Sequence, residues 1–437
     1  MTKYNPMREL PATAGYAEGD VLVLFGELFG RGYANGIVEE ARGRGMTIIG
    51  ATVGRRDGDG TLRPLNAEEL AAAEELLGGR IINVPLEAGF DMEPTDDGRS
   101  PVEQLKGIKP DEWDEVRLDW NGIEQSRQRG IARFTAAVAK FADELEKTVP
   151  AGANLLFVHT MAGGMPRARV YMPLFNRVFK GQGERYLSSE LFWNSELGRL
   201  CALNFDAVTA DTFTYLIDGT ASLRERVAAG GGRVGYAAYG YHGCEVLVDG
   251  TYTWQSYIPY LPGWAKMRLE ETARAACERG IKAAVYNCPE IQTNSSALFL
   301  GVEISLYPLL TALEKVEGGP VYRATAAECR ALLKEGVTLD ALLAAANEYL
   351  ASPVIAGFRD FAGWPQHNTP EQAEYMLSCA GALLGMNANP KEIVCAVLSR
   401  SVFTGVGRLM IDASWEASAP VFWLNHDIIA QSLVKQA

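Results

Sequence analysis

Residues 20–32 read Asp-Val-Leu-Val-Leu-Phe-Gly-Glu-Leu-Phe-Gly-Arg-Gly, and this stretch decides the fold. Its apolar run, Val21–Phe25, is typical of a strand that is buried on both faces of a parallel sheet. Residues 36–44 then have helical character. Three glycines join the strand to the helix: Gly26, Gly30 and Gly32.

A strand, a glycine-rich turn and a helix in this order are the setting of a dinucleotide-binding site. Glycine lets the backbone approach the pyrophosphate, and the amino-terminus of the helix holds the negative charge. The spacing is Gly-x-x-x-Gly-x-Gly rather than Gly-x-Gly-x-x-Gly. The alternative is an ordinary glycine turn between any strand and any helix.

The alternation of strands and helices continues to about residue 315. It predicts an α/β fold with a doubly wound, Rossmann-like parallel sheet. Further strands are expected at residues 46–53, 80–85, 154–158, 232–239 and 281–288. Further helices are expected at residues 67–77, 123–147, 221–229 and 264–279.

The pattern changes at residue 318, which divides the chain into two expected parts. Residues 1–318 would form the Rossmann-like catalytic domain, and residues 319–437 a mainly helical C-terminal extension packed on its core. This extension could cover the site, form a dimer surface or complete the core. Its four expected helices are residues 325–334, 339–350, 370–384 and 390–400, the first opening with Thr325-Ala-Ala-Glu328, which has the form of a capping box.

Composition excludes several classes of function. The 437 residues carry a formal net charge of −13, which argues against a nucleic acid as the main partner. The seven cysteines form no Cys-x-x-Cys pair, and the four histidines have no metal-ligand spacing, so we expect reduced thiols and no metal site. No targeting segment or membrane-length apolar run is present, which predicts a cytoplasmic protein without a membrane partner.

The turn after the second expected strand bears on the choice of cofactor. In such folds an acidic side chain at this point binds the 2′-hydroxyl of the adenosine ribose, whereas arginine accommodates a 2′-phosphate. Here the turn reads Gly54-Arg55-Arg56-Asp57. The two arginines favour NADPH, with NADH possible; the alternative is a pair of solvated loop arginines.

Two later loops follow the ends of expected strands and would line the site. Small residues after the fourth strand, including Ala162 and Gly163, leave room for a cofactor. Thr293 and Ser295 lie in the polar loop after the sixth strand and are candidate cofactor contacts. Arg167 and Arg169 could meet an anionic substrate, although loop arginines are usually solvated.

A tyrosine and a lysine follow the fifth expected strand. Tyr257 is separated by eight residues from Lys266, which begins a run with helical periodicity. An ammonium group close to a phenol favours the phenolate, which lowers the phenol pKa and makes a better general acid. The alternative is a packed tyrosine and a lysine on a solvated helix face.

Together, the glycine turn and the Tyr-x8-Lys spacing resemble the FabV class of trans-2-enoyl-acyl carrier protein reductases, in the short-chain dehydrogenase/reductase superfamily. Thr253-Trp254 precedes the tyrosine in a similar way. Gly240–Gly243 resembles the segment with that family's second active-site tyrosine, here Tyr241, and residues 295–297 resemble its loop after the sixth strand. Overall the chain is most similar to the FabMG group.

The resemblance implies hydride transfer from a reduced nicotinamide to the β-carbon of an enoyl thioester, in fatty acid biosynthesis. Tyr257 would hydrogen-bond the thioester oxygen and stabilise or protonate the enolate, and Lys266 would hold the nicotinamide ribose. The substrate would be carried by acyl carrier protein or coenzyme A, and the enzyme would be a monomer or homodimer. A carbonyl reductase of the same superfamily and a non-catalytic nucleotide sensor are the alternatives.

The chain departs from the FabV pattern at two points. Residues 244–251 resemble an insertion that separates Tyr241 from Tyr257. Arg55 and Arg56 stand where FabV enzymes tend to carry an acidic residue, in keeping with NADH. This second departure agrees with the expectation of NADPH.

Overall fold

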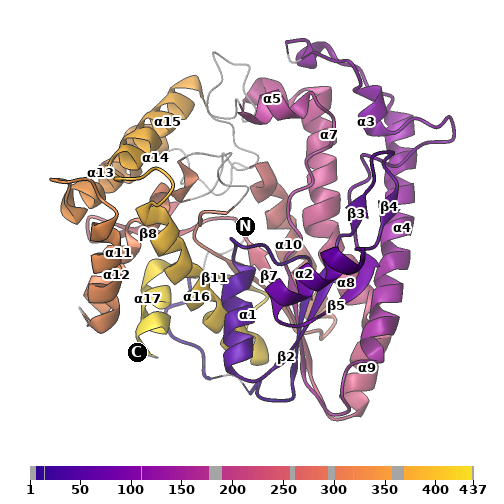
Figure 1. Cartoon of the computed structure of the whole chain (residues 1–437), viewed down its shortest axis with the longest axis horizontal. Coiled ribbons are helices and arrows are strands. Elements are labelled where there is room, and N and C mark those ends of the chain that lie inside the picture. The colour runs from indigo at the N-terminus through magenta and orange to yellow at the C-terminus, as the bar shows by residue number, and fades with distance from the viewer. Residues whose placement is uncertain are drawn as a thin grey trace.

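The computed structural model describes residues 6–13, 15–109, 111–176, 189–255, 261–293, 301–317, 319–356 and 369–435. Within these ranges, the centre of the molecule is a seven-stranded parallel sheet with the order β11-β10-β7-β6-β1-β2-β5 (Figure 1). Its strands are β1 (Val21–Phe25), β2 (Thr47–Thr52), β5 (Arg80–Pro85), β6 (Leu155–His159), β7 (Val234–Gly240), β10 (Ala283–Asn287) and β11 (Val421–Trp423).

The strand order reverses at β1. The chain runs outward from β1 to β2 and β5, and then returns to place β6 on the other side of β1. The predicted doubly wound, Rossmann-like sheet is therefore confirmed. In such a sheet the ligand site lies outside the carboxyl ends of the strands, at the point of reversal.

Helices cover both faces of the sheet, as Figure 1 shows. Leu22 and Leu24 of β1 belong to one core, and Val21, Val23 and Phe25 to the other, because side chains alternate along a strand. The first core is covered by α1 (Ala34–Gly43), α2 (Ala67–Leu77) and α16 (Val394–Trp415). The second is covered by α4 (Trp120–Glu146), α8 (Thr212–Gly219), α9 (Ala221–Ala229) and α10 (Leu261–Glu278).

Helices α1 and α16 meet backbone to backbone. A Cβ atom at Gly36 would lie 1.8 Å from the carbonyl oxygen of Phe403, and one at Gly407 would lie 2.3 Å from the carbonyl carbon of Gly36. Among the described helices, α16 alone is long and apolar enough to cross a membrane, but 67% of its apolar window is buried. Packing inside the protein therefore accounts for its apolar residues.

Two antiparallel hairpins interrupt the alternation. The first joins β3 (Arg55–Arg56) to β4 (Leu62–Arg63), and the second joins β8 (Cys244–Val248) to β9 (Thr251–Gln255). The segment that resembles an insertion, residues 244–251, thus comprises the first strand of a hairpin, its turn and the first residue of its second strand. The remaining N-terminal elements are α3 (Pro101–Gln104), η1 (Trp113–Glu115), α5 (Tyr171–Asn176), α6 (Glu190–Trp193), α7 (Glu196–Phe205) and the π-helix η2 (Asp206–Asp211).

The C-terminal part differs from the sequence-based expectation in three ways. The capping box expected at Thr325 is wrong, because α12 already begins at Pro320 and Thr325 lies inside it. The last expected helix starts at Val394 instead of residue 390 and is much longer. The strand β11 and helix α17 were not expected. The helices η4 (Val302–Leu306) and α11 (Leu309–Glu317) precede this part. Its other elements are α12 (Pro320–Ala331), α13 (Leu339–Ala351), α14 (Pro353–Ala356), α15 (Pro370–Gly385) and α17 (His426–Val434).

Candidate active site

A groove follows the carboxyl edge of the sheet. It consists of three adjoining cavities of about 400, 240 and 420 Å³. Glu27 and Phe29, in the glycine-rich turn after β1, line all three cavities. The groove therefore passes the point where the strand order reverses, the usual place for a nucleotide in an open α/β sheet.

The glycine-rich turn is packed closely against the loop that follows β6. Gly26 has a φ of 138°, and a Cβ atom there would lie 2.3 Å from Oγ1 of Thr160. Glycine is required at this position because any side chain would close the gap between the two loops. All three predicted glycines line the groove: Gly26 in the first and second cavities, Gly30 in the first and Gly32 in the third.

The carboxylate of Glu27 lies between the ends of β1 and β2. Its Oε1 atom accepts hydrogen bonds from Thr52 Oγ1 at 2.6 Å, from the Val53 backbone at 3.0 Å and from Arg55 Nη1 at 2.8 Å. The sequence places no acidic residue directly after β2, but the fold brings this one there from the end of β1. Arg55 is therefore paired with a carboxylate, although its side chain remains 40% exposed.

Arg56 is also paired with acidic side chains. Its guanidinium bonds Glu87 and lies 3.6 Å from Glu93, and its side chain is only 14% exposed. Arg167 bonds the same Glu87 and lines the second cavity, and both it and Arg169 are exposed. Arg55 and Arg56 are therefore both paired with carboxylates, so they are not simply solvated loop arginines.

The loop after β6 forms the wall between the second and third cavities, as predicted from its small residues. Ala162 lines both cavities. Gly163 has a φ of 100°, and its carbonyl accepts a hydrogen bond from Thr209 Oγ1 at 2.9 Å. The carbonyl of Gly164 accepts another from Asn204 at 2.7 Å. Contacts from α7 and η2 thus hold this wall in place.

Lys266 is buried at the third cavity. It lies in the second turn of α10, only 2% of it is exposed, and its ammonium donates a hydrogen bond to the carbonyl of Tyr239 at 2.8 Å. Burial lowers the pKa of Lys266 to about 8. The alternative of a lysine on a solvated helix face is therefore wrong.

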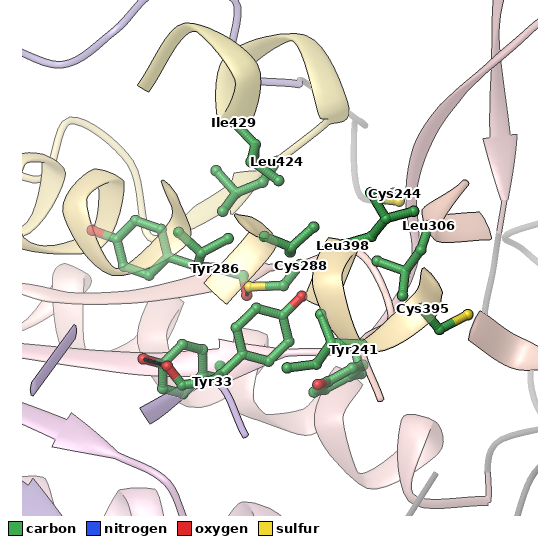
Figure 2. Close-up of a cluster of buried hydrophobic side chains, with 14 of the residues drawn as sticks. Tyr33, Tyr241, Cys244, Tyr286, Cys288, Leu306, Cys395, Leu398, Leu424 and Ile429 are labelled. Carbon is green, nitrogen blue, oxygen red and sulfur yellow. Dashed lines mark hydrogen bonds between the residues drawn. The ribbon is translucent and has the colours of Figure 1, made fainter. Parts of the chain in front are cut away.

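A cluster of tyrosines adjoins this ammonium group. Nζ of Lys266 lies 5.8 Å from the ring centroid of Tyr241, which follows the end of β7. Tyr33 packs its ring on both Tyr239 and Tyr241, at 5.3 and 5.9 Å between centroids. Figure 2 shows Tyr33 and Tyr241 beside each other in the buried cluster that continues through Cys288.

A buried polar network supports the segment that carries Tyr241. Glu270 of α10 bonds Nδ1 of His242 at 2.9 Å and accepts a hydrogen bond from Asn287 at 2.8 Å. Asn287 in turn accepts a hydrogen bond from the His242 backbone at 3.0 Å. The network ties the ends of β7 and β10 to α10, the helix that carries Lys266.

A buried lysine beside a phenol, at the nucleotide edge of a Rossmann-like sheet, fits a nicotinamide-dependent reductase. A family model described as enoyl-acyl carrier protein reductase FabMG matches residues 3–433. The chain belongs to the FabMG family. An apo FabMG structure, described as a novel type of enoyl-acyl carrier protein reductase, is 50% identical and has a TM-score of 0.95, covering 100% of this chain and 98% of that one.

A second FabMG structure, described as NADH-bound, is 41% identical over 100% of both chains, with a TM-score of 0.79. A comparison with curated proteins gives no match. The resemblance to the FabMG group is confirmed, and the protein is an enoyl-acyl carrier protein reductase of fatty acid biosynthesis. The alternatives of a carbonyl reductase and of a non-catalytic sensor are thereby set aside.

The predicted site residues of this FabMG reductase are only partly placed by the structure. Lys266, Tyr241 and Thr293 line the third cavity. Tyr257 and Ser295 lie outside the described residues. In the part of the chain that is described, no group of three or more His, Cys, Asp or Glu side chains is placed to hold a metal ion.

The sequence analysis missed several residues that line the groove, among them Glu27, Tyr33, Glu87 and Glu290. Glu27 stands within the quoted glycine-rich turn, so its type and position were visible. The other three residues follow no local pattern that marks them as part of the FabMG active site.

Proposed function

We propose that this reductase uses NADH in preference to NADPH, and that the third cavity receives the enoyl group. The observation that carries the cofactor proposal is the Glu27 carboxylate, held at the ends of β1 and β2 by Thr52, Val53 and Arg55. A carboxylate at this point suits the 2′-hydroxyl of an adenosine ribose and repels a 2′-phosphate. The NADH-bound FabMG relative supports the same choice.

This proposal revises the NADPH preference expected from the sequence. That expectation required two arginines free to grip a phosphate, but Arg55 is paired with Glu27, and Arg56 with Glu87 and Glu93. A 2′-phosphate would have to break these ion pairs and approach their carboxylates. NADPH is therefore the weaker ligand.

The residues of the third cavity fit a reduced nicotinamide and an enoyl thioester. Bound NADH supplies the hydride that reaches the β-carbon. Lys266, buried against Tyr239 and Tyr241, binds the nicotinamide ribose and places a positive charge beside the developing enolate. Tyr257, with Tyr241 beside Lys266, donates the hydrogen bond to the thioester oxygen.

The family indicates acyl carrier protein as the carrier of the substrate, and a coenzyme A thioester would present the same reacting atoms. We further propose that residues 319–437 serve to complete the core, since β11 joins the main sheet and α16 packs on α1. Whether the enzyme works as a monomer or a homodimer stays a prediction, as does the division at residue 318.

A spectrophotometric assay tests the proposed function. Oxidation of NADH and of NADPH is followed with an enoyl-acyl carrier protein, with crotonyl-coenzyme A and with a panel of ketones. We expect turnover with the enoyl thioesters and a higher kcat/KM with NADH. A kcat/KM that is equal or higher with NADPH would contradict the cofactor proposal.

The variant Glu27→Gln isolates the carboxylate. Loss of its charge removes the repulsion of the 2′-phosphate and weakens the acceptor for the 2′-hydroxyl, so the preference for NADH should shrink. A charge-assisted hydrogen bond contributes about 1.5–3 kcal/mol, and the change in preference should be roughly tenfold or more. Glu68→Gln, an exposed site in the first turn of α2, is the matched control.

A further inference from the structure

A buried carboxyl group lines the third cavity without an assigned role. Glu290 follows β10 by three residues, is 2% exposed, and lines the same cavity of about 420 Å³ as Tyr33, Tyr241 and Lys266. Among the described residues, the other carboxyl group that lines this cavity is Glu27. Glu27 is held by Arg55 at the nucleotide end of the groove, which leaves Glu290 as the acid at the catalytic end.

The loop that carries Glu290 is fixed on both sides. The Cys288 backbone donates a hydrogen bond to the carbonyl of Gly240 at 3.2 Å. The phenol of Tyr33 donates to the carbonyl of Pro289, and the Gln292 backbone donates to Ser399 Oγ at 2.8 Å. These contacts hold the carboxyl group on the wall of the cavity.

The surroundings favour the protonated form of Glu290. Burial raises its pKa well above the usual range, and the nearby carboxyl group of Glu303, in η4, raises it further. The pKa of Glu303 is itself raised to about 7 by burial. A neutral carboxyl group is a proton donor at neutral pH.

We propose that Glu290 is the general acid that delivers the proton of the reduction. The inference rests on the enoyl reductase activity, in which hydride from the bound reduced nicotinamide reaches the β-carbon and leaves an enolate. The O–H bond of Glu290 breaks, and the electron pair of the enolate forms the new C–H bond at the α-carbon. The carboxylate that remains regains its proton from solvent before the next turnover.

The positions of these side chains in the cavity assign each a separate role. Lys266 and the tyrosines stabilise the enolate oxygen, while Glu290 supplies the proton from the loop after β10. The two groups can act together in one cavity. The ammonium of Lys266 stabilises the enolate, and the neutral carboxyl group of Glu290 then protonates it.

Three variants of the full-length enzyme test this role, with NADH and an enoyl-acyl carrier protein as substrates. Glu290→Gln keeps the shape of the side chain but has no acidic proton, so turnover should fall about 100-fold or more, as for other general acids. NADH affinity and Tm should stay at the wild-type values. Glu290→Asp retains an acid, so its turnover should be at least tenfold higher than that of Glu290→Gln.

The third variant, Glu290→Ala, is used for chemical rescue. Rescue would show that loss of turnover comes from the missing acid and not from misfolding. In Glu290→Ala, added formate should raise turnover severalfold, whereas formamide should not. Neither additive should affect the control Glu328→Gln, an exposed glutamate that is paired with Arg400 and does not line this cavity.

Two results would overturn the inference. Turnover of Glu290→Gln within about twofold of wild type would show that another group supplies the proton. A loss of turnover that follows a loss of NADH affinity in all three variants, with no rescue by formate, would show that Glu290 only holds the nicotinamide. An inactive wild type would instead contradict the enoyl reductase function, so the two failures are distinguishable.

Discussion

The carboxylate of Glu27 and the guanidinium of Arg55 form an ion pair of 2.8 Å across the ends of β1 and β2. This pair changes how the arginines after the second strand are interpreted, since they no longer favour NADPH. In the sequence they stand where a 2′-phosphate would be bound. In the fold they pair with acidic side chains from the turn after β1 and from the segment after β5.

The double variant in which Arg55 and Arg56 both become Ala should therefore affect the two cofactors alike. The arginines hold Glu27, Glu87 and Glu93 in place, so their loss should disturb the groove for NADH and NADPH to a similar degree. Dissociation constants from cofactor fluorescence would measure this. If affinity for NADPH falls at least tenfold more than that for NADH, the arginines do bind the 2′-phosphate.

Lys266 should give the enzyme an alkaline limit. Because burial lowers its pKa to about 8, the ammonium is charged below that pH and neutral above it, so kcat/KM should fall as the pH rises through about 8. The free energy of unfolding should increase between pH 8 and 10.5, because over that range the unfolded chain binds the proton and the folded chain does not.

Variants of Lys266 check this assignment. Lys266→Met should lose turnover and cofactor affinity while Tm stays equal or rises, since an apolar side chain replaces a buried charge. Lys266→Arg should not restore activity fully, because a planar guanidinium does not fit a site built for a point charge. If kcat/KM of Lys266→Met still falls as the pH rises through about 8, another group causes the alkaline limit.

Tyr257→Phe removes the proposed hydrogen bond to the thioester oxygen, so it should lower turnover by about 100- to 1,000-fold, the usual cost of losing one oxyanion donor, and leave cofactor affinity nearly intact. Steady-state kinetics with an enoyl thioester and NADH would measure both. Tyr241→Phe is the comparison, since its ring already lies 5.8 Å from Nζ of Lys266. If Tyr241→Phe abolishes turnover and Tyr257→Phe does not, Tyr241 is the catalytic phenol.

Gly36→Ala should destabilise the protein where α1 crosses α16. The new methyl group would stand 1.8 Å from the carbonyl oxygen of Phe403, and overpacking of this kind typically costs about 1–3 kcal/mol. A methyl group added at Gly43, in the same helix, would meet no neighbouring atom within 4 Å, so Gly43→Ala should be neutral or slightly stabilising. Denaturant unfolding of both variants tests the difference; equal midpoints would contradict it.

Local patterns were sufficient for the framework of the fold. The apolar runs at β1, β2, β5, β6, β7 and β10 are continuous because these strands are buried on both faces, and their positions agree with the predicted ones to within about two residues. The glycine turn and the small residues after β6 were also visible in the sequence. A Cβ atom at Gly26 would lie 2.3 Å from Thr160, and one at Gly164 would lie 2.5 Å from the Asn204 carbonyl oxygen.

In the C-terminal part, local patterns did not predict two features that depend on tertiary contacts. The strand β11 has three residues and forms because β10 offers a free edge, which no local sequence feature records. Helix α12 begins at Pro320, although Thr325 has the better capping sequence, because tertiary packing buries Thr325 inside the helix.

By itself, the sequence determined the doubly wound sheet, the glycine turn at its reversal point and the resemblance to enoyl reductases, because strand periodicity and turn chemistry are local properties. Only the tertiary structure decided which charges meet. Glu27 reaches Arg55 from the turn after the neighbouring strand β1, and Glu290 reaches the cavity of Lys266 from the loop after β10. Ion pairing and burial depend on distances in space between residues far apart in the chain, and both the proposed preference for NADH and the proposed role of Glu290 rest on these two properties.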